Sequence, residues 1–303
     1  MPAHSFTSNQ RALICALVAV GLWSTMATAF KWALEFSSPM ALITLAATVS
    51  WCFFGVRIAM TGSIKTLSNM PGKLIFQCAL LGLVNPAFYY WVLFTAYDLL
   101  PAQDAMAINY TWGLTLPLIA SIFSRALPSG SEAGLALLSY VGILIIATNG
   151  NLTRFEFDQP IGVVLALFST ILWGLSWVIN SRVVDANAID PELALFLNFS
   201  ATLPVLWILT SLTDGLAGFS LASLLGGLYV GLFEMGVAFV LWMNALRLTD
   251  NPLRISSLIF LAPPLSLLLI AQVLNEAISG STLMGLVIIL IGLAGQQLLD
   301  RSK

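Results

Sequence analysis

Glu234 is the residue whose type and position point most directly to chemistry. It stands about midway along the apolar segment 220–247, in the setting Val230-Gly-Leu-Phe-Glu-Met-Gly-Val237. An ionisable group deep in a membrane segment is costly, and it usually faces a cavity or a partner. We therefore predict that Glu234 carries a proton or forms the counter-charge of a substrate ammonium. The alternative is a neutral, hydrogen-bonded acid that only holds neighbouring helices together.

Asn85 lies 149 residues before Glu234 and is followed by Pro86, inside another apolar segment. A proline within a helix removes one backbone donor and frees a carbonyl, which a neighbouring helix or a wet cavity then has to satisfy. Pro263 and Pro264 form a second interruption further along the chain. Broken helices near the membrane midplane often mark a transport site, although an ordinary kink explains Pro86 equally well.

Aromatic and amide side chains stand at helical spacing around these breaks. Asn85 and Tyr89 are four residues apart, and Asn109 and Trp112 are three apart, so each pair can face one cavity. Aromatic belts at the membrane surface and ordinary bundle packing are the competing explanations. The predicted substrate-binding residues are Trp23, Asn85, Tyr89, Asn109, Tyr110, Trp112, Trp173, Trp177 and Glu234.

The inventory of reactive residues argues against an enzyme. The sole histidine, His4, lies in a short polar tail, so no histidine base stands near a nucleophile at membrane depth. Cys15, Cys52 and Cys78 show no metal or redox spacing, and neither a metal-ligand cluster nor a phosphate-cradling glycine motif is present. We expect no catalytic residue, no metal, no cofactor and no nucleic-acid partner.

Ten apolar segments account for nearly the whole chain. Hydrophobic residues make up 59% of the sequence and charged residues 9%, against about 25% charged in an ordinary soluble domain. Each segment is long enough to cross a membrane as a helix, which takes about 20 residues, and none alternates as the strands of a membrane barrel do. The predicted spans are 11–34, 39–61, 73–97, 102–125, 132–150, 160–182, 191–213, 220–247, 252–275 and 280–299.

The chain is predicted to be a duplication, with five spans in residues 1–150 and five in 151–303. Trp23 and Trp173 lie 150 residues apart in similar contexts. If the N-terminus is cytoplasmic, ten of the twelve Lys and Arg residues fall on the cytoplasmic side, as the positive-inside rule requires. We therefore place both termini in the cytoplasm. Because five is an odd number, the two halves are predicted to be inverted repeats.

Three motifs carry a resemblance to a known family: Leu22-Trp23-Ser24-Thr25-Met26, Asn109-Tyr110-x-Trp112 and Leu172-Trp173-Gly174. With the five-plus-five duplication, they resemble the drug/metabolite transporter (DMT/EamA) superfamily, and most closely its bacterial aromatic amino-acid and paraquat exporters. The resemblance covers nearly the whole chain. It implies an all-α integral membrane protein with ten inverted-repeat helices around a central cavity, lined by the aromatic side chains of Trp23, Tyr89, Trp112 and Trp173.

The expected function is broad-specificity export of aromatic and other amino acids across a bacterial inner membrane by alternating access. Stacking on Trp and Tyr tolerates many apolar side chains, because it involves few directional bonds. Three alternatives remain open: an exporter of cationic aromatic drugs such as paraquat, a flippase for lipids or lipid-linked sugars, and a non-transporting membrane receptor or scaffold. The expected partners are the small-molecule substrate and membrane lipid, and the sequence leaves the oligomeric state undetermined.

Overall fold

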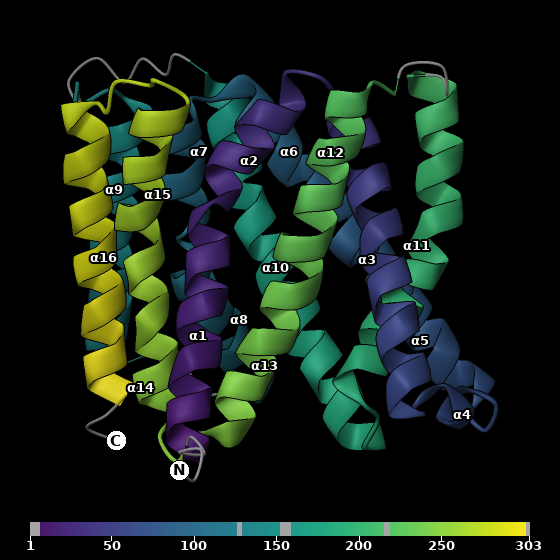
Figure 1. The fold of residues 1–303 in the computed structure, drawn as a ribbon. Helices are drawn as coiled ribbons and strands as arrows, with labels where there is room; N and C mark the ends of the chain where they lie inside the picture. The colour runs from purple at the N-terminus through teal and green to yellow at the C-terminus, as the bar shows by residue number, and fades with distance from the viewer. Residues whose placement is uncertain (1–6, 126–128, 152–158, 215–218, 301–303) are drawn as a thin grey trace, which may run out of the picture.

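Long helices run side by side across the molecule in the computed structural model (Figure 1). The structure describes residues 7–125, 129–151, 159–214 and 219–300, and within these ranges all regular secondary structure is helical. The all-α class predicted from the sequence is confirmed. The first helix begins and the last helix ends at the same face of the molecule (Figure 1), which we call the terminal face; the opposite face is the distal face.

The helices of the first part of the chain are α1 (Ser8–Ser24), α2 (Met26–Leu34), α3 (Pro39–Thr61), α4 (Ile64–Leu67), α5 (Gly72–Gly82), η1 (Leu83–Phe88), α6 (Tyr89–Leu99), α7 (Ala102–Asn109), α8 (Trp112–Ser124) and α9 (Gly130–Ala147). Those of the second part are α10 (Pro160–Asn187), α11 (Pro191–Thr213), α12 (Leu221–Tyr229), η3 (Val230–Val237), α13 (Ala238–Leu248), α14 (Pro252–Ser257), η4 (Leu258–Leu261), α15 (Ala262–Val273) and α16 (Gly280–Asp300). Several of these are consecutive pieces of one membrane-crossing helix.

Nine helices of the described ranges are long and apolar enough to cross a membrane. They match nine of the ten predicted spans, with ends that differ by a few residues. α10 continues to Asn187, five residues past the predicted end at 182, because hydropathy detects only the part of a helix that lies in hydrocarbon. At the fifth predicted span, 132–150, the apolar helix covers only Ala133–Ala147, so a count of ten crossings stays a prediction.

Local sequence explains where the helices begin. At α3 the Ser38 hydroxyl accepts a hydrogen bond from the Ala41 N–H, and Pro39 occupies the first turn, where its missing N–H costs nothing. At α11 the Asp190 carboxylate accepts from the Glu192 N–H, and again a proline follows the cap. Each cap satisfies a backbone N–H group of the first turn that has no partner within its helix.

Both third helices of the predicted halves contain a π-helical segment. η1 carries Asn85, whose backbone is non-helical with φ −144° and ψ 114°, and η3 carries Glu234. A π segment shifts hydrogen bonding from i→i+4 to i→i+5, so some carbonyls need other partners. In η3 the Ser50 hydroxyl donates a 2.8 Å hydrogen bond to the Gly231 carbonyl. The Gly231 carbonyl is thereby hydrogen-bonded by a neighbouring helix, which matters because lipid offers no donor.

Glycines allow the closest helix contacts. α9 and α16 pack through Gly142 and Gly285. A Cβ added to Gly142 would lie 2.6 Å from the Gly285 carbonyl oxygen, and a Cβ added to Gly285 would lie 2.5 Å from the Gly142 carbonyl oxygen. A Cβ on Gly82 would lie 2.1 Å from the Asn198 carbonyl oxygen. Within lipid the hydrophobic effect does not drive helices together, so their association depends on close packing. Small residues at such crossings allow the backbones to approach closely enough for this packing.

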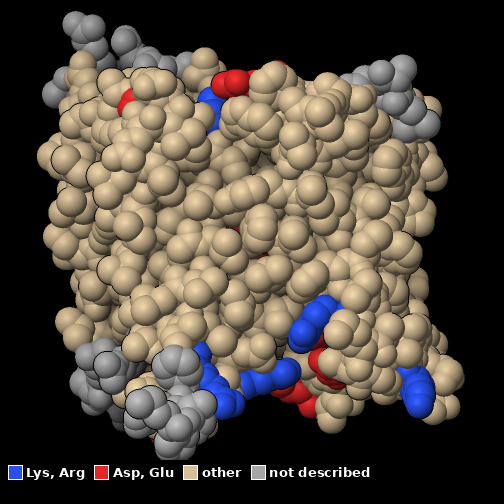
Figure 2. Space-filling model, viewed as in Figure 1, with Lys and Arg blue, Asp and Glu red and all other residues tan. Residues whose placement is uncertain are grey.

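Charged side chains gather at the two ends of the molecule on the face shown in Figure 2, and the band between them is tan except for a small recessed spot of red near its middle. Such a band is expected where hydrocarbon surrounds a membrane protein. More basic side chains appear at the terminal face than at the distal face in this view (Figure 2). Near the terminal face, Arg57 forms a bidentate ion pair with Glu192, with N···O distances of 2.7 and 3.0 Å.

Candidate binding cavity

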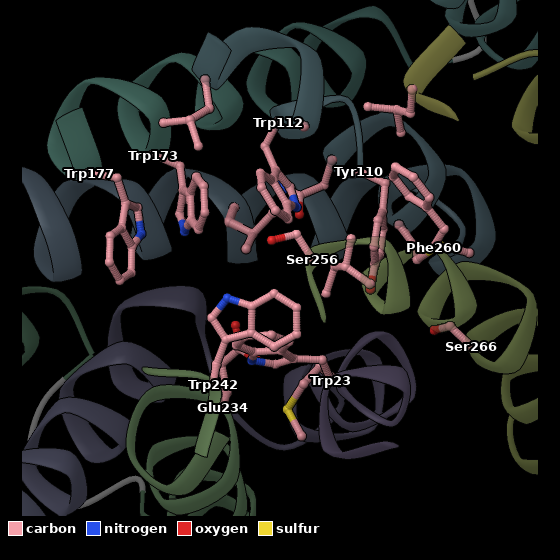
Figure 3. A pocket seen from close by; sticks show the side chains of 18 of the residues that line it. Trp23, Tyr110, Trp112, Trp173, Trp177, Glu234, Trp242, Ser256, Phe260 and Ser266 are labelled. Atoms are coloured by element: carbon pink, nitrogen blue, oxygen red, sulfur yellow. The ribbon is translucent and has the colours of Figure 1, made fainter. Parts of the chain in front are cut away.

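A cavity of about 500 Å³ lies within the helix bundle. Eight of the nine predicted substrate-binding residues line it: Trp23, Tyr89, Asn109, Tyr110, Trp112, Trp173, Trp177 and Glu234. They come from both parts of the chain, and Figure 3 shows how most of them face a common space. The volume falls in the range of roughly 300–1,000 Å³ that is typical of small-molecule sites.

Indole rings form much of the wall. Trp112 and Trp173 have ring centroids 4.3 Å apart, and Trp173 and Trp177 are 5.4 Å apart. On the opposite side of the space in Figure 3, Trp23 and Trp242 lie 5.3 Å apart. Tilted and edge-on aromatic pairs at these separations are mutually attractive, which fixes the ring orientations. The two sides leave a slot whose surfaces suit a flat apolar ring.

Glu234 is the charged residue of the lining in the described part of the chain. It projects from η3, and its Oε1 accepts a hydrogen bond of 3.1 Å from the hydroxyl of Tyr90, which is itself almost fully buried. In Figure 3 Glu234 lies on the same side of the space as Trp23 and Trp242. One carboxylate oxygen is therefore held in place by Tyr90, and a carboxylate beside indole faces can bind a cation or exchange a proton.

Asn109 and Tyr110 stand where α7 ends and α8 is about to begin. The Asn109 amide donates a hydrogen bond of 3.0 Å to the Ser169 hydroxyl of α10, which positions the side chain at the cavity wall. The chain resumes its helix at Trp112, and Asn109, Tyr110 and Trp112 at this junction all line the cavity. The fourth predicted span is thus interrupted at the cavity, and the interruption carries no proline.

The structure does not bring Asn85 into this cavity. Its amide donates a hydrogen bond of 2.9 Å to the Ser176 hydroxyl, and with Pro86 it lines a separate pocket of about 30 Å³. Asn85 and Tyr89 therefore do not share a face as their spacing predicted. Pro263 is buried and Pro264 exposed in the first turn of α15, directly after the short 3₁₀ turn η4, and neither lines the cavity.

Several residues of the lining were not predicted from the sequence. The shift of 149 residues that relates Asn85 to Glu234 also relates Leu93 to Trp242 and Tyr97 to Leu246, and all four of these lie in the wall. The 149-residue shift could therefore have indicated Trp242 as a lining residue. Other lining residues gave no signal of this kind: Phe30, Phe239, Met243, Ser256, Phe260, Ser266, Gln296 and Gln297.

The distal end of the cavity is covered by a polar network that joins distant parts of the chain. The Glu276 carboxylate accepts hydrogen bonds from the Ala102 and Gln103 N–H groups, at 3.1 and 3.2 Å, and so caps α7. The Gln103 side chain donates to the Ala277 carbonyl and accepts from the Ser279 N–H. These bonds tie the turn between α6 and α7 to the turn between α15 and α16.

Lys31 adds a second tie at the same end. Its ammonium donates hydrogen bonds of 2.8 Å to the carbonyls of both Tyr97 and Leu100, at the end of α6. A cation at the C-terminus of a helix is favourable because it meets unpaired carbonyls and the negative end of the helix dipole. Phe30 and Tyr97, each 3% exposed, fill the cavity wall just below. The distal end is therefore shut by buried aromatic rings under a hydrogen-bonded cap.

No group of three or more His, Cys, Asp or Glu residues in the described ranges is placed to hold a metal ion. Cys15, Cys52 and Cys78 are free thiols at separate places in the bundle. None of them lines the cavity.

The fold and the cavity define a multi-pass membrane protein with an aromatic, small-molecule-sized site between its helices. The chain belongs to the EamA-like transporter family, whose model matches residues 10–148 and again residues 160–295. This confirms the family predicted from the tryptophan and asparagine motifs.

Two curated relatives and one solved structure are similar to the chain. A probable amino-acid metabolite efflux pump of Salmonella typhimurium is 26% identical over 59% of this chain and 61% of its own length. The aromatic amino acid exporter YddG of Salmonella typhimurium is 21% identical over 94% of this chain and 96% of its own. A protein crystal structure with 21% identity superposes with a TM-score of 0.67, covering 96% of this chain and 98% of the other, which shows a common fold.

Proposed function

We propose that the protein exports aromatic and other amino acids across a bacterial inner membrane by alternating access. The observation that carries the proposal is a cavity of about 500 Å³ whose walls are indole rings and whose charged lining residue is Glu234. An apolar side chain fits between the rings, and the substrate ammonium meets the carboxylate. The names of the two Salmonella relatives point to the same substrate class.

An inverted repeat of five plus five helices, with both termini cytoplasmic, underlies the proposed mechanism. The packing supports it: α1 lies against α13, and the corresponding α10 lies against α6. Likewise α3 packs on α11 and α9 on α16, which are pairs of corresponding helices. A twofold relation of the halves predicts such partners. The family model also matches each half once.

The closed distal end supports the alternating access. In our proposal the distal face is the outer face, and the cap made by Lys31, Gln103 and Glu276 is the outer gate in its closed state. To release substrate outward, the α6–α7 turn must separate from the α15–α16 turn. Cysteines at Gln103 and Ala277, joined by a short cross-linker in a Cys52→Ser background, should stop transport until the linker is cleaved. Undiminished transport with the turns linked would contradict this gate.

The substrate proposal is tested with purified protein in liposomes and labelled phenylalanine, with and without a proton gradient. We expect saturable flux that falls at least about tenfold in kcat/KM in Trp112→Ala, because the slot loses one wall. Trp91→Ala is the matched control, since Trp91 is 39% exposed and does not line the cavity. Dependence on the gradient would indicate proton coupling, and independence would indicate facilitated diffusion.

The other outcomes of this experiment separate the alternatives. Folded protein that carries methyl viologen but no amino acid would be an exporter of cationic aromatic compounds, for which indole faces and Glu234 are equally suited. Movement of a fluorescent lipid between leaflets, without amino-acid flux, would indicate a flippase. Absence of any flux, with wild-type stability in Trp112→Ala, would leave a receptor or scaffold.

A further inference from the structure

Two polar groups in the cavity wall have no hydrogen-bond partner within the described part of the chain. The Ser266 hydroxyl on α15 and the indole N–H of Trp177 on α10 are buried, line the cavity and have no hydrogen-bond partner among the described residues. Ser266 is 1% exposed. Leaving a buried polar group unpaired is unfavourable, so in native proteins such groups are rare and usually need an explanation.

Ser266 differs from other serines of this bundle. The hydroxyls of Ser24, Ser50 and Ser139 each donate to the carbonyl four residues earlier in their own helix, which is the usual way to satisfy a membrane serine. Ser266 makes no such bond. Its hydroxyl points instead from α15 toward the cavity (Figure 3). It is therefore available to an occupant of the cavity as both donor and acceptor.

The positions of the polar groups define the shape of that occupant. Trp177 and Ser266 lie at opposite ends of the labelled residues in Figure 3, with Trp173, Trp112 and Tyr110 between them across the view. The charged groups of an amino acid share one carbon atom, so a single zwitterionic head is too short to meet both ends. An occupant that satisfies both carries a polar group at each end of an apolar ring.

We infer that Ser266 binds the polar group at the far end of an aromatic substrate, so that the carrier prefers tyrosine and tryptophan to phenylalanine. This rests on the proposed amino-acid export. The substrate ammonium lies at Glu234 and its carboxylate accepts from the Trp177 N–H. The ring lies between the tryptophans, and the phenol O–H or indole N–H meets the Ser266 hydroxyl. Phenylalanine would leave Ser266 unpaired, and a site with an unpaired buried group discriminates against the shorter analogue.

The test compares tyrosine with phenylalanine, which differ by one hydroxyl, in liposomes carrying wild type or Ser266→Ala. We expect wild type to favour tyrosine by about tenfold in kcat/KM, mainly through KM. Ser266→Ala should abolish this preference, so that tyrosine and phenylalanine are carried with about the same kcat/KM. Ser223→Ala is the matched control, because Ser223 is also 1% exposed but donates to the Ser220 carbonyl and does not line the cavity.

The substrates also serve as internal controls. Phenylalanine flux in Ser266→Ala shows that the variant is folded, so a lost tyrosine preference is not a folding defect. Equal losses for both amino acids, or a preference that survives the substitution, would overturn the role of Ser266. If wild-type protein transports neither amino acid, the proposed export itself fails, which is a distinct result.

Discussion

The π segments η1 and η3 occupy equivalent places in the third helices of the two predicted halves, yet their polar residues have different surroundings. In η1 the polar residue is Asn85, which does not line the cavity and donates a hydrogen bond to the Ser176 hydroxyl. In η3 it is Glu234, which faces the cavity and bonds to Tyr90. The π segment of the first predicted half thus carries a polar side chain that is hydrogen-bonded within the bundle. The π segment of the second carries a carboxylate that lines the cavity.

Tyr90 makes the comparison asymmetric in a second way. It is the second residue of α6, which follows η1 directly, and its hydroxyl donates a hydrogen bond to the Glu234 carboxylate of the other predicted half. The first π segment therefore contributes to the site indirectly, through the tyrosine that follows it, whereas the second contributes its own side chain. A duplicated unit can in this manner place one acid in a cavity without a second acid opposite it, and repulsion between two close carboxylates is avoided.

The largest effect on transport is expected from neutralising Glu234, the charged residue of this pair. We expect Glu234→Gln to reduce kcat/KM for amino acids by at least about thirtyfold, because a buried counter-charge of the substrate ammonium is lost, which costs about 2–5 kcal/mol. Any dependence on a proton gradient should disappear with it. Flux assays in liposomes, with thermal unfolding as the check on folding, measure both. A variant with wild-type kinetics would assign Glu234 a purely structural role.

Moving the acid tests whether position or mere presence of a carboxylate matters. In Asn85→Glu combined with Glu234→Gln, the acid would enter a pocket of about 30 Å³ that is separate from the cavity. We expect no recovery of transport and a loss of stability of roughly 3 kcal/mol or more, because a charge is buried without a partner. Recovered flux would mean that the two sites communicate in a state other than the one described.

Removing the hydrogen bond between Tyr90 and Glu234 should reduce transport less than neutralising Glu234 does. Tyr90→Phe deletes the hydroxyl that holds Glu234 Oε1, and a hydrogen bond to a charged group is worth about 1.5–3 kcal/mol. We expect a loss of about tenfold or somewhat more in kcat/KM for amino acids. Tyr140→Phe on α9 serves as the control, since Tyr140 does not line the cavity. If the two variants behave alike, Tyr90 does not position the carboxylate.

The difference between η1 and η3 also marks how far sequence could predict the site. Hydropathy located the membrane helices, because burial in lipid demands about 20 consecutive apolar residues whatever the tertiary contacts are. The register of 149 residues paired Asn85 with Glu234. It did not reveal which of them faces the cavity, since a π segment adds a residue to one turn and rotates the side chains around it. The non-helical backbone at Asn85 separates it from Tyr89 for that reason.

Ser266 shows a different limit. A serine in an apolar helix is ordinary, and its hydroxyl usually bonds within its own helix. Only the three-dimensional arrangement shows that this one lacks a partner and borders a cavity. The tryptophan motifs were informative because large rings at helical spacing must be packed together somewhere. Single polar atoms carry no such requirement.

The smallest effect on transport is expected from substituting Asn85, the residue of η1 that corresponds to Glu234. Asn85→Ala removes the hydrogen bond to Ser176, and Ser176 keeps its own bond of 2.8 Å to the Trp173 carbonyl. We therefore expect a loss of about 1 kcal/mol in stability, and transport per folded molecule within about threefold of wild type. Chemical denaturation and liposome flux on the same preparation measure the two quantities. A large rise in KM without loss of stability would return Asn85 to the substrate site, and the two π segments would then be functionally alike.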